Sequence, residues 1–316
     1  MTAVPPPRVV VLAGGLSHER DVSLRSGRRV ADALRSVGVD VSVHDVDADL
    51  VPALLQLQPD LVWPLLHGTS GEDGSVRDVV QMLGLRLLGT GPRESRIAWS
   101  KPIAKTVAVR AGLATPDFVT LPQSLFRELG ARQVLDSIVR RLGLPVVVKP
   151  SRGGSALGVT LVSGADALPQ AMVDCFAYSD TALVERAVAG TEVAVSVVDT
   201  GDGPFALPAV EIVTDGPYDF DARYNPGRTE YFAPARLSPA LTERVRDVAV
   251  AAHVALGLEG LSRTDLIVDD DGTVWFLEVN VAPGMTETSL LPQAAEAAGL
   301  QLGDLYRALV EAALAR

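Results

Sequence analysis

The sequence predicts an α/β fold that begins with a doubly wound parallel sheet, and three observations lead to this prediction. Apolar strand-like runs alternate with helical patterns over residues 8–66. Turn-forming pairs, Gly14-Gly15 and His67-Gly68, follow the first and third of these runs. The chain has 316 residues, 47% hydrophobic and 21% charged, which is enough for two or three lobes with real cores.

The first strand is expected at residues 8–13, a continuous, largely β-branched run typical of a strand buried on both faces. A helix then runs to about Val37, a strand covers 39–43, a helix 50–57 and a third strand 61–66. In doubly wound sheets ligands bind beyond the carboxyl ends of the strands. We therefore expect the turns after the first and third strands to lie at a binding site.

The pattern changes near residue 92. We expect a helix over 95–111 with Pro102 near a helix start, and a new segment from Pro116. The later elements are a helix at 127–142, strands at 146–149 and 159–162, a helix at 165–177, and strands at 182–185 and 190–198. Residues 214–236 lack a period and predict a long functional loop. A helix at 242–256, a hairpin of 264–268 with 274–279, a loop at 280–288 and a helical tail complete the chain.

Composition restricts the partners and the compartment. A net charge of −11 and a pI near 4.9 argue against nucleic acid or an anionic membrane as the main partner. The single cysteine, Cys175, excludes an internal disulfide and lies in an apolar helical run, so we expect a buried thiol and a cytoplasmic protein. Of 28 basic residues only Lys101, Lys105 and Lys149 are lysines, which makes the position of each informative.

A phosphate site is indicated where Lys149 ends a strand just before the glycine-rich loop 151–158. Backbone N–H groups in such a loop can enclose phosphate oxygens while the lysine supplies a point charge. The segment is not a Walker A motif. The alternative is an ordinary glycine-rich turn beside a surface lysine.

A metal site is indicated by the late hairpin. Glu278 and Asn280 are two residues apart and share a face, and Asp265 lies on the neighbouring strand. Oxygen ligands of this kind suit Mg²⁺, which completes its shell with phosphate and water. Glu278 also follows an almost wholly apolar strand, where a carboxylate is costly without a counter-charge. The alternative to a metal site is that these three residues simply form the polar edge of the hairpin. The acidic turn 269–271 between its strands is interpreted as a solvent-exposed turn.

His67-Gly68-Thr69-Ser70-Gly71-Glu72-Asp73-Gly74 reads either as a substrate loop or as a plain polar loop. Four histidines and one cysteine without a nucleophile elbow do not favour acyl-enzyme chemistry. Gly14-Gly15 lacks G-x-G-x-x-G, so a dinucleotide site is not supported.

Taken together, these motifs resemble the D-alanine–D-alanine ligases of the ATP-grasp superfamily from about residue 8 to the C-terminal helices. The stretches concerned are 14–23, 67–74, 149–158, Arg223-Tyr224, Arg263-x-Asp265 and 278–290. The resemblance implies three lobes: residues 1–92 for substrate, 93–187 as the central ATP-grasp lobe, and 188–316 as the C-terminal lobe with a mobile loop at 214–236. ATP would be gripped between the last two lobes.

The resemblance also implies roles. The family joins two D-alanines through an acyl phosphate, with ATP and Mg²⁺ (two ions, or Mn²⁺ in their place). The substrate residues would be Glu19, Val22 and His67 for the first D-alanine, and Ser289 and Leu290 for the carboxylate of the second. Ser155 and Tyr224 would link to Glu19, and Arg263 with the Gly284 N–H would stabilise the oxyanion. ATP would contact Lys101, Lys149, Ser155, Glu185, Val188, Glu192 and Arg223, and the metal ligands would be Asp265, Glu278 and Asn280.

The sequence departs from the family pattern at Arg223, where a lysine is usual, and at Ser100, Ala187, Thr264 and Val281-Ala282. The resemblance implies that Tyr224 favours an amine acceptor, because family members that accept D-lactate usually lack this tyrosine. We therefore expect a D-alanine–D-alanine ligase for peptidoglycan precursors, and from the family a homodimer. The alternatives are a ligase for another amino-acid pair in a resistance or biosynthetic pathway, and a non-catalytic ATP-binding regulatory module.

Overall fold

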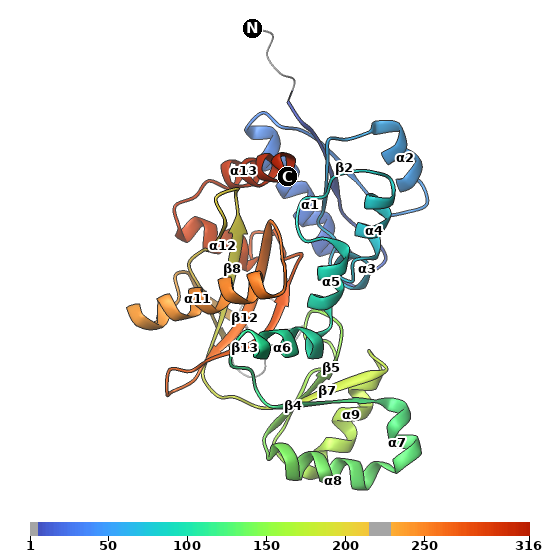
Figure 1. The fold of residues 1–316 in the computed structure, drawn as a ribbon, viewed down its shortest axis with the longest axis vertical. Helices are drawn as coiled ribbons and strands as arrows, with labels where there is room; N and C mark the ends of the chain where they lie inside the picture. The colour runs from blue at the N-terminus through green and yellow to red at the C-terminus, as the bar shows by residue number, and fades with distance from the viewer. Residues whose placement is uncertain (1–5, 215–228) are drawn as a thin grey trace.

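The computed structural model describes residues 6–214 and 229–316 and contains three sheets, one in each of three lobes (Figure 1). The N-terminal and C-terminal lobes lie side by side, and the central lobe forms the opposite end of the molecule (Figure 1). The α/β fold predicted from the sequence is confirmed.

The N-terminal sheet is parallel, with β1 (Arg8–Leu12) between β2 (Asp40–His44) and β3 (Leu61–Pro64). Alternate β1 residues face opposite sides: Val9 and Val11 pack against α1 (Arg20–Ser36), and Val10 and Leu12 share a core with α2 (Leu50–Leu57). Both faces are therefore covered, which confirms the doubly wound arrangement. The short α3 (Thr69–Glu72) and α4 (Ser75–Met82) follow β3.

The central sheet is antiparallel in the order β4-β7-β5-β6. Its strands are β4 (Phe118–Pro122), β5 (Val146–Pro150), β6 (Thr160–Val162) and β7 (Thr181–Arg186). One face packs on α8 (Ala131–Leu142) and α9 (Leu168–Phe176), and Cys175 is buried in this core as predicted. The helix expected at 127–142 is instead two helices, because Gly130 with φ +79° separates α7 (Gln123–Leu129) from α8.

The C-terminal sheet has the order β11-β10-β8-β12-β13, with β9 added beside β8. Its strands are β8 (Thr191–Asp199), β9 (Pro204–Ala206), β10 (Val210–Thr214), β11 (Thr229–Phe232), β12 (Leu261–Val268) and β13 (Val274–Asn280). The expectation of a loop throughout 214–236 is wrong in part, since residues 229–232 form β11 against β10. Residues 215–228 of that loop lie outside the described part of the chain.

Helices from both ends of the sequence complete the C-terminal lobe. On one face, α11 (Pro239–Ala255) shares a core with α5 (Pro92–Trp99) and α6 (Lys101–Arg110). The helix expected over 95–111 is thus interrupted at Ser100, whose backbone is extended, and Pro102 lies in the first turn of α6 as predicted. The proposed lobe boundary at 92/93 coincides with the start of α5, although α5 and α6 pack on β13. The division into 1–92, 93–187 and 188–316 therefore stays a prediction.

The last two helices, α12 (Leu290–Ala297) and α13 (Leu302–Ala315), lie between the N-terminal and C-terminal sheets. Helix α13 packs on α1 and β3, so that the C-terminus returns to the N-terminal lobe (Figure 1). Tyr306 meets Trp63 edge to face with ring centroids 5.5 Å apart. This packing fixes the lobe that carries Glu19 and His67 against the lobe that carries the late hairpin.

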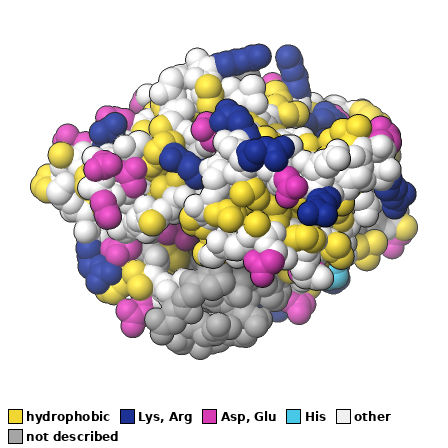
Figure 2. Space-filling model, turned by 90° about the horizontal axis from the view of Figure 1, so that it is seen from below, with side chains coloured by type: hydrophobic (Ala, Val, Ile, Leu, Met, Phe, Trp, Pro, Cys, Tyr) yellow, Lys and Arg dark blue, Asp and Glu magenta, His cyan; other side chains and the backbone are white. Residues whose placement is uncertain are grey.

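The surface of the molecule carries side chains of both charges. Acidic and basic side chains are interspersed over the face of the molecule that Figure 2 shows. Within the described residues, the structure contains no helix of the length and hydrophobicity that a membrane span requires.

Candidate active site

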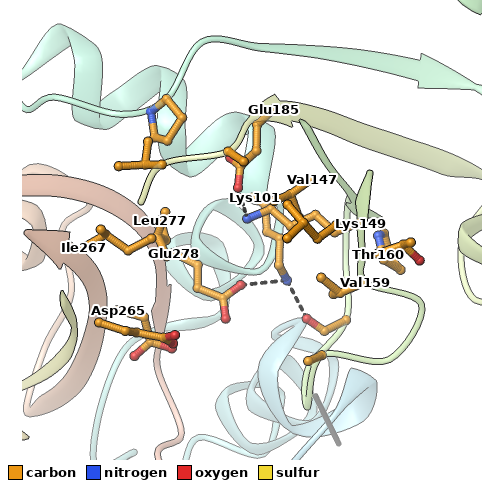
Figure 3. A pocket seen from close by; sticks show the side chains of 18 of the residues that line it. Lys101, Val147, Lys149, Val159, Thr160, Glu185, Asp265, Ile267, Leu277 and Glu278 are labelled. Carbon is orange, nitrogen blue, oxygen red and sulfur yellow. Dashed lines mark hydrogen bonds and ion pairs between the residues drawn. The ribbon is translucent and has the colours of Figure 1, made fainter. Parts of the chain in front are cut away.

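A cavity of about 680 Å³ lies between the central and C-terminal sheets (Figure 3). Because side chains alternate along a strand, Val146 and Val148 enter the core behind β5, while Val147 and Lys149 face the cavity. The C-terminal sheet contributes Ile267 and Leu277, so the cavity has apolar side chains on both walls and charges at one end. Such a combination suits a ligand with an aromatic part and a charged part.

Lys101 connects the two walls of the cavity. It is the first residue of α6, and its Nζ lies 2.6 Å from the carbonyl oxygen of Gly153 and 3.0 Å from Oε2 of Glu278 (Figure 3). Its backbone N–H also donates to the carbonyl oxygen of Ser151 at 3.0 Å. The start of α6 therefore fixes the glycine-rich loop and places a positive charge beside it.

Lys149 and Glu185 form the charged end of the central sheet. Lys149 Nζ lies 2.5 Å from Glu185 Oε1, and the other carboxylate oxygen lies 2.7 Å from Nζ of Lys105. Burial lowers the pKa of Lys105 to about 8, although Glu185 opposes this effect. Burial also acts to lower the pKa of Lys149, but the carboxylates of Glu185 and Glu278 outweigh it and raise that pKa. Lys149 therefore stays charged where it faces the cavity.

The proposed metal ligands meet on the C-terminal sheet. Asp265 and Glu278 are paired across β12 and β13, and a bulge after Asp265 places Leu277 as the extra residue. Both consecutive residues Leu277 and Glu278 consequently line the cavity. Arg263 holds Asp265 with two hydrogen bonds of 2.7 and 2.9 Å, while Glu278 is paired with Lys101. The two carboxylates are thus matched by cationic side chains in this structure.

Asn280 lies next to this pair but is bonded to the following loop. Its Oδ1 accepts a hydrogen bond of 2.7 Å from the N–H of Ala282. A carbonyl oxygen has a second lone pair, so this bond leaves it able to meet a cation. In residues 6–214 and 229–316, no three Asp, Glu, His or Cys side chains gather as a preformed metal site.

Glu19 and Ser155 are 136 residues apart in the sequence but lie in contact. Glu19 occupies the N-cap position of α1 without a side-chain cap bond, and its Oε1 accepts a hydrogen bond from the Ser155 hydroxyl. Ser155 has a left-handed backbone with φ +53°, a conformation that side chains other than glycine rarely adopt. A strained residue that places its hydroxyl on a carboxylate is typical of a functional site.

Glu72 is a site residue that sequence reasoning did not select. It is buried, and its Oε1 accepts a hydrogen bond of 2.9 Å from the N–H of Gly68. Burial and the nearby charge of Glu19 raise its pKa to about 8. A Cβ on Gly154 would lie 3.4 Å from a Glu19 oxygen and 3.9 Å from a Glu72 oxygen, so the two carboxyl groups converge on the glycine-rich loop. The acidic Glu72-Asp73 pair in the 67–74 motif was the available signal.

His67 lies three residues beyond the end of β3, which stops at Pro64 and not at residue 66 as predicted, and both of its ring nitrogens contact protein groups. Nδ1 is 3.0 Å from the carbonyl oxygen of Ala282, and Nε2 is 3.3 Å from the hydroxyl of Ser26. Burial lowers the pKa of His67, so the ring stays neutral. Ser26 was also missed, since a serine inside an amphipathic helix carries no sequence signal of its own.

The remaining predicted residues lie around the same site. Ser289 caps α12, and its hydroxyl accepts a hydrogen bond of 2.9 Å from the N–H of Thr286, while the Leu290 side chain is in the core. Gly284 faces Ser289, because a Cβ there would lie 2.7 Å from the Ser289 hydroxyl oxygen. Val188 and Glu192 line the cavity, and Val22 is half-buried one turn after Glu19 on α1. Arg223 and Tyr224 lie outside the described residues.

Two antiparallel sheets that enclose a cavity, with Lys149 on one wall, paired carboxylates on the other and Lys101 between them, define an ATP-grasp fold. The family model described as D-ala D-ala ligase C-terminus matches residues 107–311. The D-alanine–D-alanine ligase of Desulforudis audaxviator is 40% identical over 98% of this chain and 99% of its own, and that of Bordetella petrii is 39% identical over 97% and 92%. The chain belongs to the D-alanine–D-alanine ligase family.

Solved structures agree with this assignment. The D-alanine–D-alanine ligase of Bacillus anthracis complexed with ATP has a TM-score of 0.80 and 28% identity, covering 98% of this chain and 97% of its own. The VanG D-Ala:D-Ser ligase of Enterococcus faecalis has a TM-score of 0.85 at 24% identity, with 98% and 99% covered, and shares the fold.

Proposed function

We propose that this protein uses ATP to join two D-alanines into D-alanyl-D-alanine for peptidoglycan precursor synthesis. Transfer of the γ-phosphoryl group to the first carboxylate gives ADP and an acyl phosphate. The second amine then attacks the acyl carbon, and phosphate leaves from the tetrahedral intermediate while the amine loses a proton. The observation that carries the proposal is the charged end of the cavity, which opens beside the Glu19–Ser155 hydrogen bond.

The residues of the cavity support ATP binding. Lys149 and Lys101 place two ammonium groups at the glycine-rich loop, where phosphates would be held, and the apolar walls would take the adenine near Val188. Glu185 is less free than expected for an adenine contact, because both of its oxygens are paired with lysines. We therefore propose that Glu185 orients Lys149 as well as bordering the adenine, with Glu192 near the ribose.

A small cavity next to the ATP site is lined by two of the proposed catalytic residues, Ser155 and Arg263, together with Glu72 and Asn280 among others. Glu19 would hold the ammonium group of the first D-alanine. Arg263 and the N–H of Gly284 would stabilise the developing oxyanion, and the Ser289 turn at the start of α12 would take the second carboxylate. Val22 would bound the first subsite from one helical turn further along α1.

The residues present fit Mg²⁺ as a bound cofactor. Asp265 and Glu278 supply cross-strand carboxylates and Asn280 an amide oxygen, which are the hard oxygen ligands that Mg²⁺ prefers. When bound, the ion would neutralise phosphate charge. Arg263 and Lys101, which now balance these carboxylates, would then be released toward the anionic reactants. A homodimer, which comes from the family resemblance, and a cytoplasmic location, which comes from the cysteine content, complete the proposal.

The decisive experiment is ADP release with a panel of amino acids, followed by product mass. We expect D-alanine with Mg²⁺ and ATP to give D-alanyl-D-alanine with one ADP for each dipeptide. D-serine, D-lactate and L-alanine test the alternative of another substrate pair. Failure of D-alanine to stimulate ADP release would contradict the proposal, and ATP binding without turnover on any member of the panel would favour the regulatory module.

A further inference from the structure

The segment Pro283–Gly284 is tied down at both ends by residues of the N-terminal lobe. On one side, His67 Nδ1 lies 3.0 Å from the carbonyl oxygen of Ala282. On the other side, the N–H of Met285 donates to the Ser26 hydroxyl at 3.1 Å. The N–H of Gly284 therefore lies between two anchored peptide groups.

The two anchors also contact each other. Ser26 Oγ lies 3.3 Å from His67 Nε2, and both side chains are buried. A carbonyl oxygen can only accept, so the proton of the neutral ring is on Nδ1 and Nε2 is the acceptor. The Ser26 hydroxyl, which accepts from Met285, then donates to His67. One arrangement of protons satisfies every bond and closes a ring around Pro283–Gly284.

The chain on either side of the ring is held as well. The N–H of Ala282 donates to Asn280, and the Met285 side chain is fully buried, with the Tyr306 hydroxyl 3.5 Å from its sulfur. Gly284 itself is only half-buried and faces Ser289. It is therefore the partly exposed residue of a segment whose neighbouring peptide groups are hydrogen-bonded. Freedom to reorient the Gly284 N–H is thus limited by its neighbours and not by a side chain of its own.

We propose that Ser26, acting directly on Met285 and through His67 on Ala282, is a positioning residue that aims the Gly284 N–H at the oxyanion of the second reaction step. The inference rests on the proposed function for its chemical readout. Ser26 and Glu19 lie on the same face of the start of α1, seven residues or about two helical turns apart. Helix α1 therefore positions both Glu19, which would bind the ammonium group of the first substrate, and Ser26, which holds the segment that carries the Gly284 N–H. A small displacement of that donor is expected to slow the step strongly.

Ser23 provides a matched control on the same helix. It is as fully buried as Ser26, accepts a hydrogen bond of 2.8 Å from the N–H of Gly14, and donates one of 2.7 Å to the carbonyl oxygen of Leu65. These bonds stay inside the N-terminal lobe. Ser23→Ala should therefore cost stability in the same way as Ser26→Ala but should not release the Pro283–Gly284 segment.

The first readout is amide hydrogen exchange of the ligand-free protein over residues 281–289. We expect Ser26→Ala to accelerate exchange there about tenfold or more, and Ser23→Ala to leave it at the wild-type rate. Unchanged exchange in Ser26→Ala, or equal acceleration in both variants, overturns the inference that Ser26 holds the Pro283–Gly284 segment. Should Ser26→Ala fail to fold, Ser26→Cys carries the same comparison, because a thiol keeps the volume but bonds weakly.

The second readout is catalytic. In Ser26→Ala we expect kcat for dipeptide to fall roughly 10- to 100-fold with KM for ATP unchanged within about twofold. The ratio of ADP to dipeptide should rise above one, because an acyl phosphate that waits for a slower attack is lost to water. A ratio of one in Ser26→Ala with wild-type kcat overturns the inference. If the wild type itself releases no ADP with D-alanine, the proposed function fails, while the exchange experiment still decides whether Ser26 holds the segment.

Discussion

Glu72→Gln should make the ligand-free protein more stable at neutral pH and leave it almost unchanged in acid. Glu72 is buried, and burial together with Glu19 raises its pKa from 4.5 to about 8. The folded protein therefore keeps a proton on this side chain between these two pH values, whereas the unfolded chain releases it. Wild-type stability must fall as the pH rises from 4.5 to 8 by the contribution of this group.

The size of the effect follows from the same two pKa values. Each pKa unit corresponds to ~1.4 kcal/mol. The free energy of unfolding that the wild type loses through Glu72 therefore grows from less than ~1 kcal/mol at pH 5 to ~3 kcal/mol at pH 7 and ~5 kcal/mol well above pH 8. A glutamine resembles the protonated acid and does not titrate. Its carbonyl oxygen can still accept the Gly68 N–H bond that Glu72 now accepts at 2.9 Å. The difference between variant and wild type should therefore increase with pH.

The assay is urea unfolding at pH 5, 7 and 8 without nucleotide or metal. Glu128→Gln, on the exposed surface of α7, is the matched control and should follow the wild type at every pH. The reasoning would be refuted if the free energy of unfolding differed between Glu72→Gln and the wild type by the same amount at pH 5 and pH 8. The buried carboxyl would then carry the same charge in the folded and unfolded protein. A loss of stability at pH 8 would show that Glu72 is ionised and paired.

Three further predictions concern the metal ligands, the loop and the fold. Glu278→Gln should weaken Mg²⁺-dependent binding of a non-hydrolysable ATP analogue at least about tenfold by calorimetry, whereas the exposed Glu287→Gln should not. Tyr224→Phe should raise the ratio of ADP to dipeptide, measured by chromatography, if that residue helps to exclude water. Gly71→Ala should lower the free energy of unfolding by roughly 2–3 kcal/mol, since its Cβ would lie 2.1 Å from a backbone carbonyl oxygen. Gly91→Ala, which meets only a side-chain oxygen at 3.3 Å, should cost far less.

Periodicity predicted the elements whose pattern is set by burial on a whole face. The parallel strands and the helix at 50–57 were found because β-branched runs and amphipathic spacing leave a direct trace in the sequence. The missed strands include β4, an edge strand whose residues are half-buried or exposed, the short β9, and β10, which is largely buried between β8 and β11. Their strand conformation comes from pairing with β7 and β8, which a local pattern cannot contain.

The site shows the same division between local pattern and tertiary pairing. The cross-strand position of Asp265 and Glu278 was predicted because a hairpin is local, and the approach of Ser155 to Glu19 came only with the family resemblance. The part played by Lys105 could not be predicted by either route. It lies one turn after Lys101 on α6, and this spacing is compatible both with a side chain in the same cleft and with one beside it.

The structure resolves this choice through Glu185, which lies between Lys105 and Lys149. Lys101 and Lys149 line the cavity, each paired with a carboxylate, while Lys105 is fully buried behind Glu185. A single carboxylate between two lysines leaves these three residues with one excess positive charge, which opposes the negative charges of Glu192, Asp265 and Glu278 on the same cavity. Because that charge arises from three residues on three different elements, α6, β5 and β7, no single stretch of sequence could have revealed it.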